Sequence, residues 1–324
     1  MPVCPGFSKA FDTVRHSELL QRIQALGLPD YIYNWVNSFL TGRSHSTKWG
    51  GTVSSCLPFN AGVVQGSAVG PASFVVCASG LQLVNPMNRL FKYADDTYLL
   101  VPASQSGTVM DELNHIDAWS RSFNLKPNIS KCKELVIQSP TCHSTVIVPP
   151  TGFCAGVQRV KSLVILGIHF NDKLSVCDHI SDLICASNRI MFALRTLKRA
   201  GLPNDALWVI CRATLVAKLL YCSSAWWGFA NKTHINSLEG IMRRAVRWGL
   251  FPVDGATLND LALAADRVLF RKVLENKNHI LHSLLPPVKV TLYNLRPRVH
   301  DRVLPLKTSL SVKNFLTRML YDDV

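Results

Sequence analysis

The chain has 324 residues, of which 48% are hydrophobic, and its 35 Lys and Arg residues outnumber its 21 Asp and Glu residues to give a formal net charge of +14. The hydrophobic fraction excludes general disorder, and the length is sufficient for two domains with substantial cores. The positive balance favours a polyanionic partner, because Lys and Arg side chains release counterions from phosphates.

The sequence has no evident membrane or secretory segment. Its start, Met1-Pro2-Val3-Cys4-Pro5, lacks the basic and apolar parts of a signal peptide, and glycines and prolines interrupt the uncharged stretch 49–88 before it reaches the ~18 apolar residues of a span. We therefore expect an intracellular protein, nuclear or cytoplasmic. The ten cysteines are then expected to be thiols. Neither Cys142-His143 nor Cys177-Asp178-His179 has the second ligand pair of a zinc site.

The first part of the chain alternates helical and extended patterns. Apolar stripes predict helices over 19–26 and 32–40, ended by Gly27 and near Gly42. A hairpin is predicted around Gly50-Gly51, followed by a glycine-rich turn and a buried helix. The runs Arg89–Lys92 and Thr97–Val101 predict a second β-hairpin.

The later part changes from mixed to helical. We expect a helix over 113–123, a strand at 134–137, a long loop over 139–156 and one strand over 163–170. From Asp178 the stripes are helical to Trp248, a further helix covers 258–276, and the proline-containing tail is expected to be loosely organised. The closing Tyr321-Asp322-Asp323 has no strand after it, so we interpret its likeness to Tyr93-Ala94-Asp95-Asp96 as coincidence.

Adjacent carboxylates at a hairpin turn, Asp95 and Asp96, are the most informative feature of the chain. Carboxylate oxygens are the ligands that Mg²⁺ takes from proteins, and a pair of them can hold catalytic metal ions. The alternative is a solvated turn, since Asp tolerates turn geometry and bonds its own backbone.

Further motifs decide between these alternatives. Phe7-Ser8-Lys9-Ala10-Phe11-Asp12, Gly62-Val63-Val64-Gln65-Gly66-Ser67 and Tyr93-Ala94-Asp95-Asp96 stand in an order and spacing that resemble the palm of reverse transcriptases, most closely those of LINE-class non-LTR retrotransposons. Leu125-Lys126-Pro127-Asn128-Ile129-Ser130-Lys131 and Leu166-Gly167-Ile168 resemble the next two motifs, and 193–228 resembles the helical thumb.

The resemblance implies an α+β fold: a right-hand polymerase palm with an antiparallel sheet and packed helices at 1–172, a helical thumb-like domain at 173–250 and a C-terminal extension at 251–324. The fingers expected upstream are missing, and prolines replace the apolar run of the first palm strand. The sequence thus resembles a truncated and degenerate copy.

The resemblance also implies the roles of the site residues. Asp95 and Asp96 would hold two Mg²⁺ ions beside the strand end at Phe7, and Lys131 would donate a proton to pyrophosphate. Phe11 would lie under the sugar and exclude a 2′-hydroxyl, Gln65 and Gly66 under the nascent base pair, and Tyr93 near the primer end. The alternatives are ordinary: Phe11 in the core, a glycine-rich turn at Gln65-Gly66, Tyr93 as a β-former and Lys131 as a solvated lysine.

One departure from the family pattern affects catalysis. The family's first motif opens with a metal-binding Asp, and Gly6 stands at that position. Losing about 4 kcal/mol of metal-borne transition-state stabilisation costs about a thousandfold in rate. We therefore expect weak or absent RNA-templated DNA synthesis. The alternative function is a non-catalytic nucleic-acid-binding protein with a basic thumb.

The expected partners are an RNA template, a DNA primer and, if the site is active, deoxynucleotides. The thumb-like segment is rich in basic residues, and the alternative to binding is a solvated helix face. Trp226, Trp227 and Trp248 either stack on bases or belong to the core. The basic residues expected to contact nucleic acid are Arg195, Lys198, Arg199, Arg243, Arg244 and Arg247.

Overall fold

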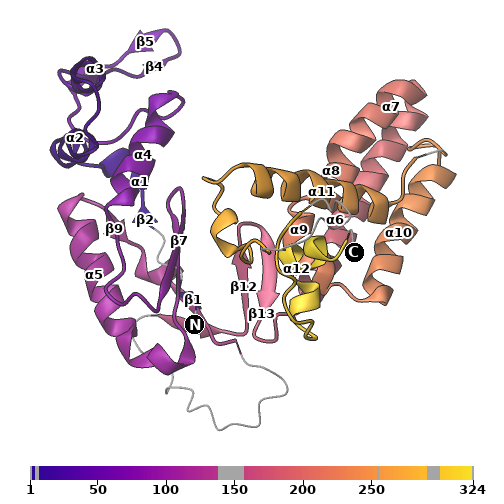
Figure 1. The fold of residues 1–324 in the computed structure, drawn as a ribbon. Coiled ribbons are helices and arrows are strands. Elements are labelled where there is room, and N and C mark those ends of the chain that lie inside the picture. Colours follow the sequence, from indigo (N-terminus) through magenta and orange to yellow (C-terminus); the bar gives the residue numbers. More distant parts are fainter. Residues whose placement is uncertain (1, 4–6, 138–156, 254, 290–299, 323–324) are drawn as a thin grey trace. The chain divides into compact units, whose positions relative to one another are not determined.

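The computed structural model describes residues 2–3, 7–137, 157–253, 255–289 and 300–322 (Figure 1). Contacts divide the chain into two compact units, Met1–Leu163 and Val164–Val324, called unit 1 and unit 2 below. Both helices and small, mainly antiparallel sheets are present, as an α+β fold requires. The predicted limits at 172 and 250 stay predictions, and the predicted loop over 139–156 lies outside the described residues.

The sheet of unit 1 has five strands in the order β11-β10-β1-β8-β7. All neighbours are antiparallel except the parallel pair β10 and β11. The strands are β1 (Pro2–Val3), β7 (Arg89–Tyr93), β8 (Asp96–Leu100), β10 (Lys133–Leu135) and β11 (Gln158–Val160).

The short strand β1 occupies the middle of this sheet, which the prolines were expected to disfavour. Pro2 pairs with Leu100, and Val3 pairs with both Leu99 and Glu134. Pro2 is the first residue of β1, a position that proline tolerates because it needs only a carbonyl there. The expectation of a damaged first strand stays a prediction, because the structure describes only these two residues before Phe7.

The predicted stripes of unit 1 form helices, and the helix Val109–Ser122 packs on the sheet, where its Val109 shares a core cluster with Leu99. The first two stripes become α2 and α3, which bury Leu19, Ile23, Val36 and Leu40. The helix at 69–79 is only half-buried, because Val75 is 65% exposed, and this corrects the expected buried helix. The helices of unit 1 are α1 (Ala10–Thr13), α2 (His16–Ala25), α3 (Asp30–Leu40), α4 (Val69–Ser79) and α5 (Val109–Ser122).

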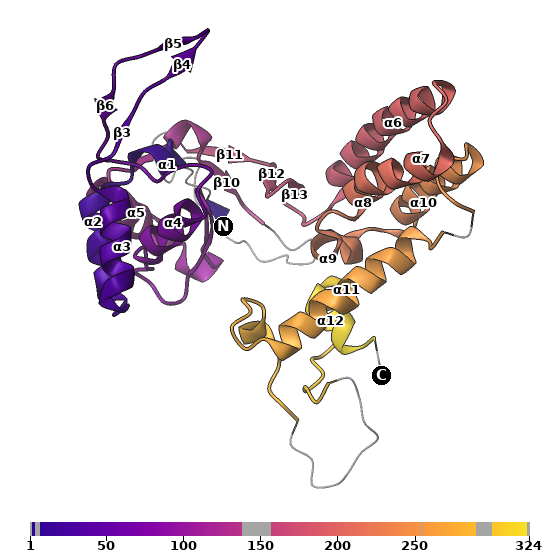
Figure 2. The same cartoon turned by 90° about the horizontal axis from the view of Figure 1, so that it is seen from above.

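A two-stranded ribbon extends from α3, and Figure 2 shows it standing away from the helices of unit 1. Its base is β3 (Ser44–His45) paired with β6 (Leu57–Pro58), and its tip is β4 (Lys48–Trp49) paired with β5 (Thr52–Val53). Gly50 and Gly51 both have positive φ, as a two-residue hairpin turn of type I′ requires. The hairpin predicted at this pair is confirmed.

The predicted strand over 163–170 is a hairpin instead, formed by β12 (Ser162–Ile165) and β13 (Ile168–Asn171). Its turn is Leu166-Gly167, with φ values of +46° and +84°. Gly167 allows the reversal, but the left-handed conformation of Leu166 has no signal in the sequence.

Unit 2 is helical around one large core. Trp226 is fully buried there and Trp227 is 7% exposed, so both belong to the core. One described helical run, 204–229, is long and apolar enough for a membrane span, a test that core helices also pass, and Leu207, Leu215 and Leu219 within it are buried. The helices are α6 (Cys177–Arg199), α7 (Asn204–Cys211), α8 (Ala217–Leu220), α9 (Ser223–Trp226), α10 (Lys232–Arg247), α11 (Leu258–Glu275) and α12 (Phe315–Leu320).

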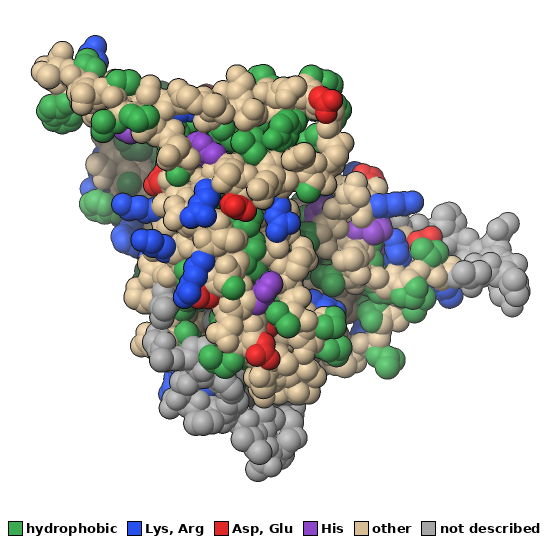
Figure 3. Space-filling model, turned by 90° about the vertical axis from the view of Figure 1, so that its left-hand side faces the viewer, with side chains coloured by type: hydrophobic (Ala, Val, Ile, Leu, Met, Phe, Trp, Pro, Cys, Tyr) green, Lys and Arg blue, Asp and Glu red, His purple; other side chains and the backbone are tan. Residues whose placement is uncertain are grey.

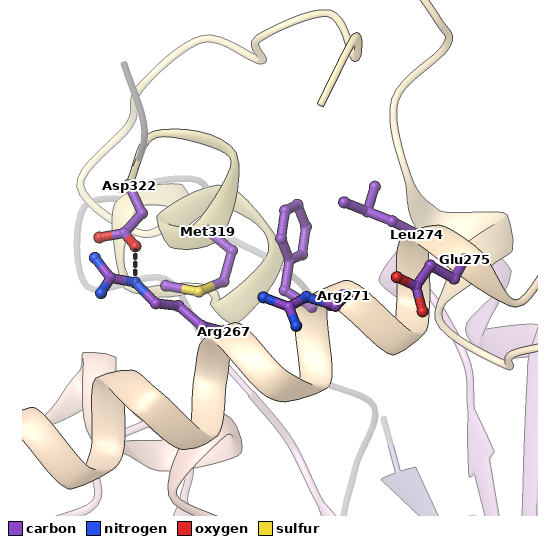
Figure 4. Close-up of a pocket in the computed structure, with 7 residues that line it drawn as sticks. Arg267, Arg271, Leu274, Glu275, Met319 and Asp322 are labelled. Carbon is purple, nitrogen blue, oxygen red and sulfur yellow. Dashed lines mark hydrogen bonds and ion pairs between the residues drawn. The ribbon is translucent and has the colours of Figure 1, made fainter. Parts of the chain in front are cut away.

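The C-terminal tail is more ordered than expected, because α12 packs on α11 through Phe270, Phe315 and Met319. Beside this contact lies a cavity of about 510 Å³, where Arg267 on α11 pairs with Asp322 at 2.7 Å (Figure 4). Tyr321 and Asp322 follow a helix, in agreement with our interpretation of their sequence as coincidence, and Asp323 lies outside the described residues.

Candidate active site

The aspartate pair lies at the turn of the β7-β8 hairpin, as predicted. Tyr93 pairs with Asp96, so Ala94 and Asp95 form a two-residue turn. Ala94 adopts the left-handed conformation, with φ of +49°, which costs an L-residue about 1–2 kcal/mol. Asp95 is half-buried and Asp96 is exposed.

Both carboxylates are open to a ligand. In the part of the chain that the structure describes, neither forms an ion pair, and the Tyr98 hydroxyl donates a long hydrogen bond of 3.4 Å to Asp96 Oδ2. The neighbouring strand β1 is antiparallel to β8. The chain in β1 therefore runs from beside Leu100 towards the Asp96 end of β8. Gly6 lies outside the described residues.

Phe7 marks the beginning of the first motif and has no ligand atom in its side chain, so a metal contact at Phe7 would use its backbone carbonyl oxygen and stays a prediction. Its side chain is 7% exposed and packs edge-on against Trp119 at 5.8 Å. The strand β2 (Phe7–Ser8) pairs with β9 (Lys126–Pro127). This pairing places the first and fourth sequence motifs side by side, and Lys131 is exposed just beyond β9.

The loop that carries Gln65 is fixed against the first motif. The Val63 N–H donates to the Phe11 carbonyl at 2.6 Å, and Gln65 Nε2 donates to Asp12 Oδ1 at 2.8 Å. Gly62 has φ of +88°, and a Cβ there would lie 2.7 Å from the Asp12 carbonyl oxygen. Only glycine therefore suits this approach.

A cavity of about 470 Å³ opens at this loop, and its wall includes Asp12, Arg43 and Gln65. Gly66 is exposed, with φ of +81° and open space where a Cβ would point. The expectation that Gln65 and Gly66 lie under the nascent base pair stays a prediction.

Phe11 and Tyr93 differ in their surroundings. Phe11 is partly buried and stacks on Phe74, with ring centroids 4.6 Å apart. Core packing is thus established for Phe11, and its contact with a sugar stays a prediction. Tyr93 is 65% exposed, so its ring is available to a ligand.

Two polar side chains that the sequence analysis missed hold the hairpin in place. Lys92 Nζ on β7 donates to the carbonyls of Ala78 and Leu81 at 2.7 and 2.9 Å, which ties the hairpin to the end of α4. Burial lowers the pKa of Lys92. Glu112 on α5 is 1% exposed and accepts from the Val84 and Asn85 amides just before β7. The apolar stripe of α5 places Glu112 on its buried face, a signal that was available in the sequence.

Comparison with known proteins now identifies the family. Residues 6–170 match the family model described as reverse transcriptase (RNA-dependent DNA polymerase). The chain belongs to this family. The match contains the three motifs around Phe11, Gln65 and Asp95, and it confirms the resemblance stated from the sequence.

The relatives of this reverse transcriptase family member come from non-LTR transposons. The RNA-directed DNA polymerase from mobile element jockey of Drosophila melanogaster is 28% identical, and the probable RNA-directed DNA polymerase from transposon BS of the same organism is 26% identical. Each alignment covers 74% of this chain, which spans 27% and 28% of the length of these relatives. A solved telomerase from Candida albicans, in complex with the TWJ fragment of telomeric RNA, has a TM-score of 0.43 and 11% identity over 81% of this chain and 50% of its own.

Several basic residues of unit 2 are engaged in contacts within the unit. The Arg195 guanidinium lies 4.4 Å from the Trp248 ring centroid, and Lys198 Nζ donates to the Trp248 carbonyl at 2.7 Å. Arg244 donates to Asn188 Oδ1 at 2.9 Å. These contacts join α6 to the end of α10 and show a structural role beside any binding role. Arg199, Arg243 and Arg247 are exposed.

The donor set fits a divalent ion in kind, because Asp95 and Asp96 offer only carboxylate oxygens. Within the described ranges, no group of three or more His, Cys, Asp or Glu side chains could hold a metal ion. Asp12, the acid of the first motif, accepts a hydrogen bond from Gln65. The metal site at Asp95 and Asp96 stays a prediction.

Proposed function

We propose that this chain is the palm and thumb portion of an RNA-directed DNA polymerase of the non-LTR type. The observation that carries the proposal is the carboxylate pair at the β7-β8 turn. Asp95 is half-buried, Asp96 is exposed, and neither has a basic partner among the described residues. Family membership and transposon relatives named RNA-directed DNA polymerase support it. The proposed limits are palm 1–172, thumb 173–250 and extension 251–324.

Each site residue has a proposed task. Asp95 and Asp96 would hold Mg²⁺, which when bound lowers the pKa of a primer 3′-hydroxyl and stabilises charge on departing pyrophosphate. Gln65 and Gly66 support the nascent base pair, and Tyr93 presents its exposed ring to the primer end. Phe11, held by Phe74, blocks a 2′-hydroxyl, and Lys131 supplies a proton to the leaving group.

We further propose that synthesis by this chain is weak or absent. Gly6 has no side chain with which to supply the third carboxylate, and the loss of about 4 kcal/mol of stabilisation slows the reaction about a thousandfold. The alternative function is nucleic-acid binding without catalysis. The exposed Arg199, Arg243 and Arg247 on α6 and α10 favour this alternative.

Primer extension on an RNA template with Mg²⁺ tests the proposal. The unmodified chain should give no detectable product, and Gly6→Asp should give at most slow extension. Adding Asp95→Ala to Gly6→Asp should remove whatever that variant gained. Robust extension by the unmodified chain that is lost in Asp95→Ala would show that the missing carboxylate at Gly6 does not limit the rate of synthesis. Extension by Gly6→Asp that survives Asp95→Ala would overturn the site assignment.

A further inference from the structure

Helix α3 and the residues just after it present a continuous stack of aromatic and cationic side chains. The Trp35 and Phe39 rings are nearly parallel, with centroids 5.6 Å apart and an interplanar angle of 14°. The Arg43 guanidinium lies over the Phe39 ring, 4.7 Å from its centroid, and Arg43 Nη1 donates to the Phe39 carbonyl at 3.1 Å. We call Tyr31, Trp35, Phe39 and Arg43 the stacking ladder; their spacing of four residues keeps Tyr31, Trp35 and Phe39 on one helix face.

The outer half of the ladder is not part of the core. Tyr31 is 73% exposed and Trp35 is 55% exposed, whereas Phe39 packs partly against the core of unit 1. Phe39 stacks on one face of the Trp35 ring, and Trp35 has no second ring contact among the described residues, so we treat its other face as the end of the stack. Large aromatic side chains exposed together mark an interaction surface.

Charge indicates which kind of partner fits this surface. No Asp or Glu occurs from Tyr31 to Ala94, while Arg43, Lys48, Arg89 and Lys92 supply positive charge. Lys48 stands beside Trp49, which is 86% exposed near the tip of the ribbon. Figure 3 shows the ribbon projecting from the top of this face of unit 1. The exposed Asp30 precedes Tyr31 at the start of α3, so the positive charge lies at the Arg43 and Lys48 end of this surface, where cationic side chains and the exposed Trp49 ring suit a chain of phosphates and flat bases.

The ladder also leads to the candidate site. Arg43, at its inner end, lines the cavity of about 470 Å³ together with Asp12 and Gln65. A strand lying on Tyr31 and Trp35 would therefore reach the rim of that cavity by following the ladder along α3.

We propose that the stacking ladder binds an unpaired nucleic-acid strand. A base continues the stack on the open face of Trp35, a neighbouring base contacts Tyr31, and phosphates lie along Arg43 and Lys48. This binding requires neither catalysis nor the basic residues of unit 2, so it can succeed or fail separately from the proposed polymerase function. Stacking does not read the sugar, so unpaired RNA and DNA should both bind.

Fluorescence of a short oligouridylate carrying one 2-aminopurine tests the proposal on the full chain, because stacking on an indole quenches this base. Trp35→Leu keeps an apolar side chain but removes the ring, and should weaken binding roughly five- to hundredfold and abolish the quenching. Trp35→Phe keeps a ring and should retain most of the binding. Ile280→Ala, at a 72% exposed apolar position of unit 2, is the control and should change nothing. An oligothymidylate probe should give the same order of variants.

Two further measurements separate strand binding at the ladder from duplex binding by unit 2 and from self-association. The same variants are measured with Arg243, Arg244 and Arg247 replaced by alanine, and the effect of Trp35→Leu should persist even if duplex binding by unit 2 is lost or never existed. Equal binding by Trp35→Leu and the unmodified chain would overturn the proposal, as would equal losses in Trp35→Phe and Trp35→Leu. Oligonucleotide binding unchanged by Trp35→Leu, with self-association of the chain lost on sedimentation, would instead make this face a contact between copies.

Discussion

Two sets of charged side chains, one in each unit, differ in their surroundings. At the β7-β8 turn of unit 1, Asp95 and Asp96 have no ion pair within the described part of the chain. In unit 2, Asp266 is fully buried and lies 2.9 Å from Arg318, and Lys198 is bonded to the Trp248 carbonyl. The difference teaches that Asp266 and Lys198 are held by contacts of the fold, whereas the aspartate pair at the β7-β8 turn is available to a ligand.

The sharpest test of this comparison removes one acid from each unit. Asp266→Ala leaves the Arg318 guanidinium without its partner in a site where Arg318 Nε and Nη2 already lack hydrogen-bond partners. Breaking a buried ion pair in this way costs about 3–5 kcal/mol of unfolding free energy. Asp96→Ala at the exposed turn should change stability by no more than about 0.5 kcal/mol.

Urea unfolding of both variants measures the two changes. The control within unit 2 is Asp322→Ala at the Arg267 pair, where the Arg267 side chain is 57% exposed, and this should cost at most about 1 kcal/mol. If Asp96→Ala destabilised the chain as much as Asp266→Ala, the aspartate pair would be structural and the comparison would fail.

The next effect is a pH dependence that comes from His179 in unit 2. Burial lowers the pKa of His179 from 6.5 to about 4, with further lowering by the charges of His169 and Lys218 and an opposing effect of Asp182. The unfolded chain then binds more protons between pH 6.5 and 4, so stability is full above pH 6.5 and falls as the pH drops to about 4. The total loss is about 3 kcal/mol.

Thermal unfolding followed across this pH range checks the prediction. His179→Phe keeps a ring against Trp226, whose centroid lies 5.2 Å away, and should flatten the acid limb of the stability curve. His45→Gln, at an exposed position of the ribbon, should leave the limb unchanged. An acid limb that survives His179→Phe would assign the proton uptake to other groups.

A smaller effect concerns nucleic-acid binding by the basic helices. Replacing Arg243, Arg244 and Arg247 together by alanine should weaken binding to every RNA-DNA duplex alike. It should also reduce the slope of log affinity against log salt concentration by about 2–3, because fewer phosphate contacts release fewer counterions on binding. Asp95→Ala should leave the affinity nearly unchanged or raise it slightly. Titrations at several salt concentrations decide the matter. A salt-independent affinity, or an unchanged slope in the triple variant, would mean that these residues serve only the fold.

The sequence predicts most elements of this fold because their signals are local. The stripes of α2, α3 and α5 carry their own end signals, and the aspartate hairpin follows from apolar runs on both sides of a turn. The hairpin at β12-β13 was missed because Leu166 adopts a positive φ that leucine does not signal. Helix α12 was missed because its order depends on packing against α11, a contact far apart in sequence. The residue types of the candidate site and the order of its motifs were predictable. The hydrogen bond from Lys92 on β7 to the end of α4 was not, because it depends on tertiary contacts.

The smallest predicted effect tests the geometry of the aspartate turn itself. Ala94 has φ of +49°, so Ala94→Gly should relieve the cost of a left-handed L-residue and stabilise the chain by roughly 0.5–1 kcal/mol. Ala72→Gly on the exposed face of α4 is the matched control and should destabilise by about 1 kcal/mol, because glycine costs backbone entropy in a helix. Urea midpoints of the two variants should therefore move in opposite directions. A loss of stability in Ala94→Gly as large as that in Ala72→Gly would contradict the left-handed conformation of Ala94 at the β7-β8 turn.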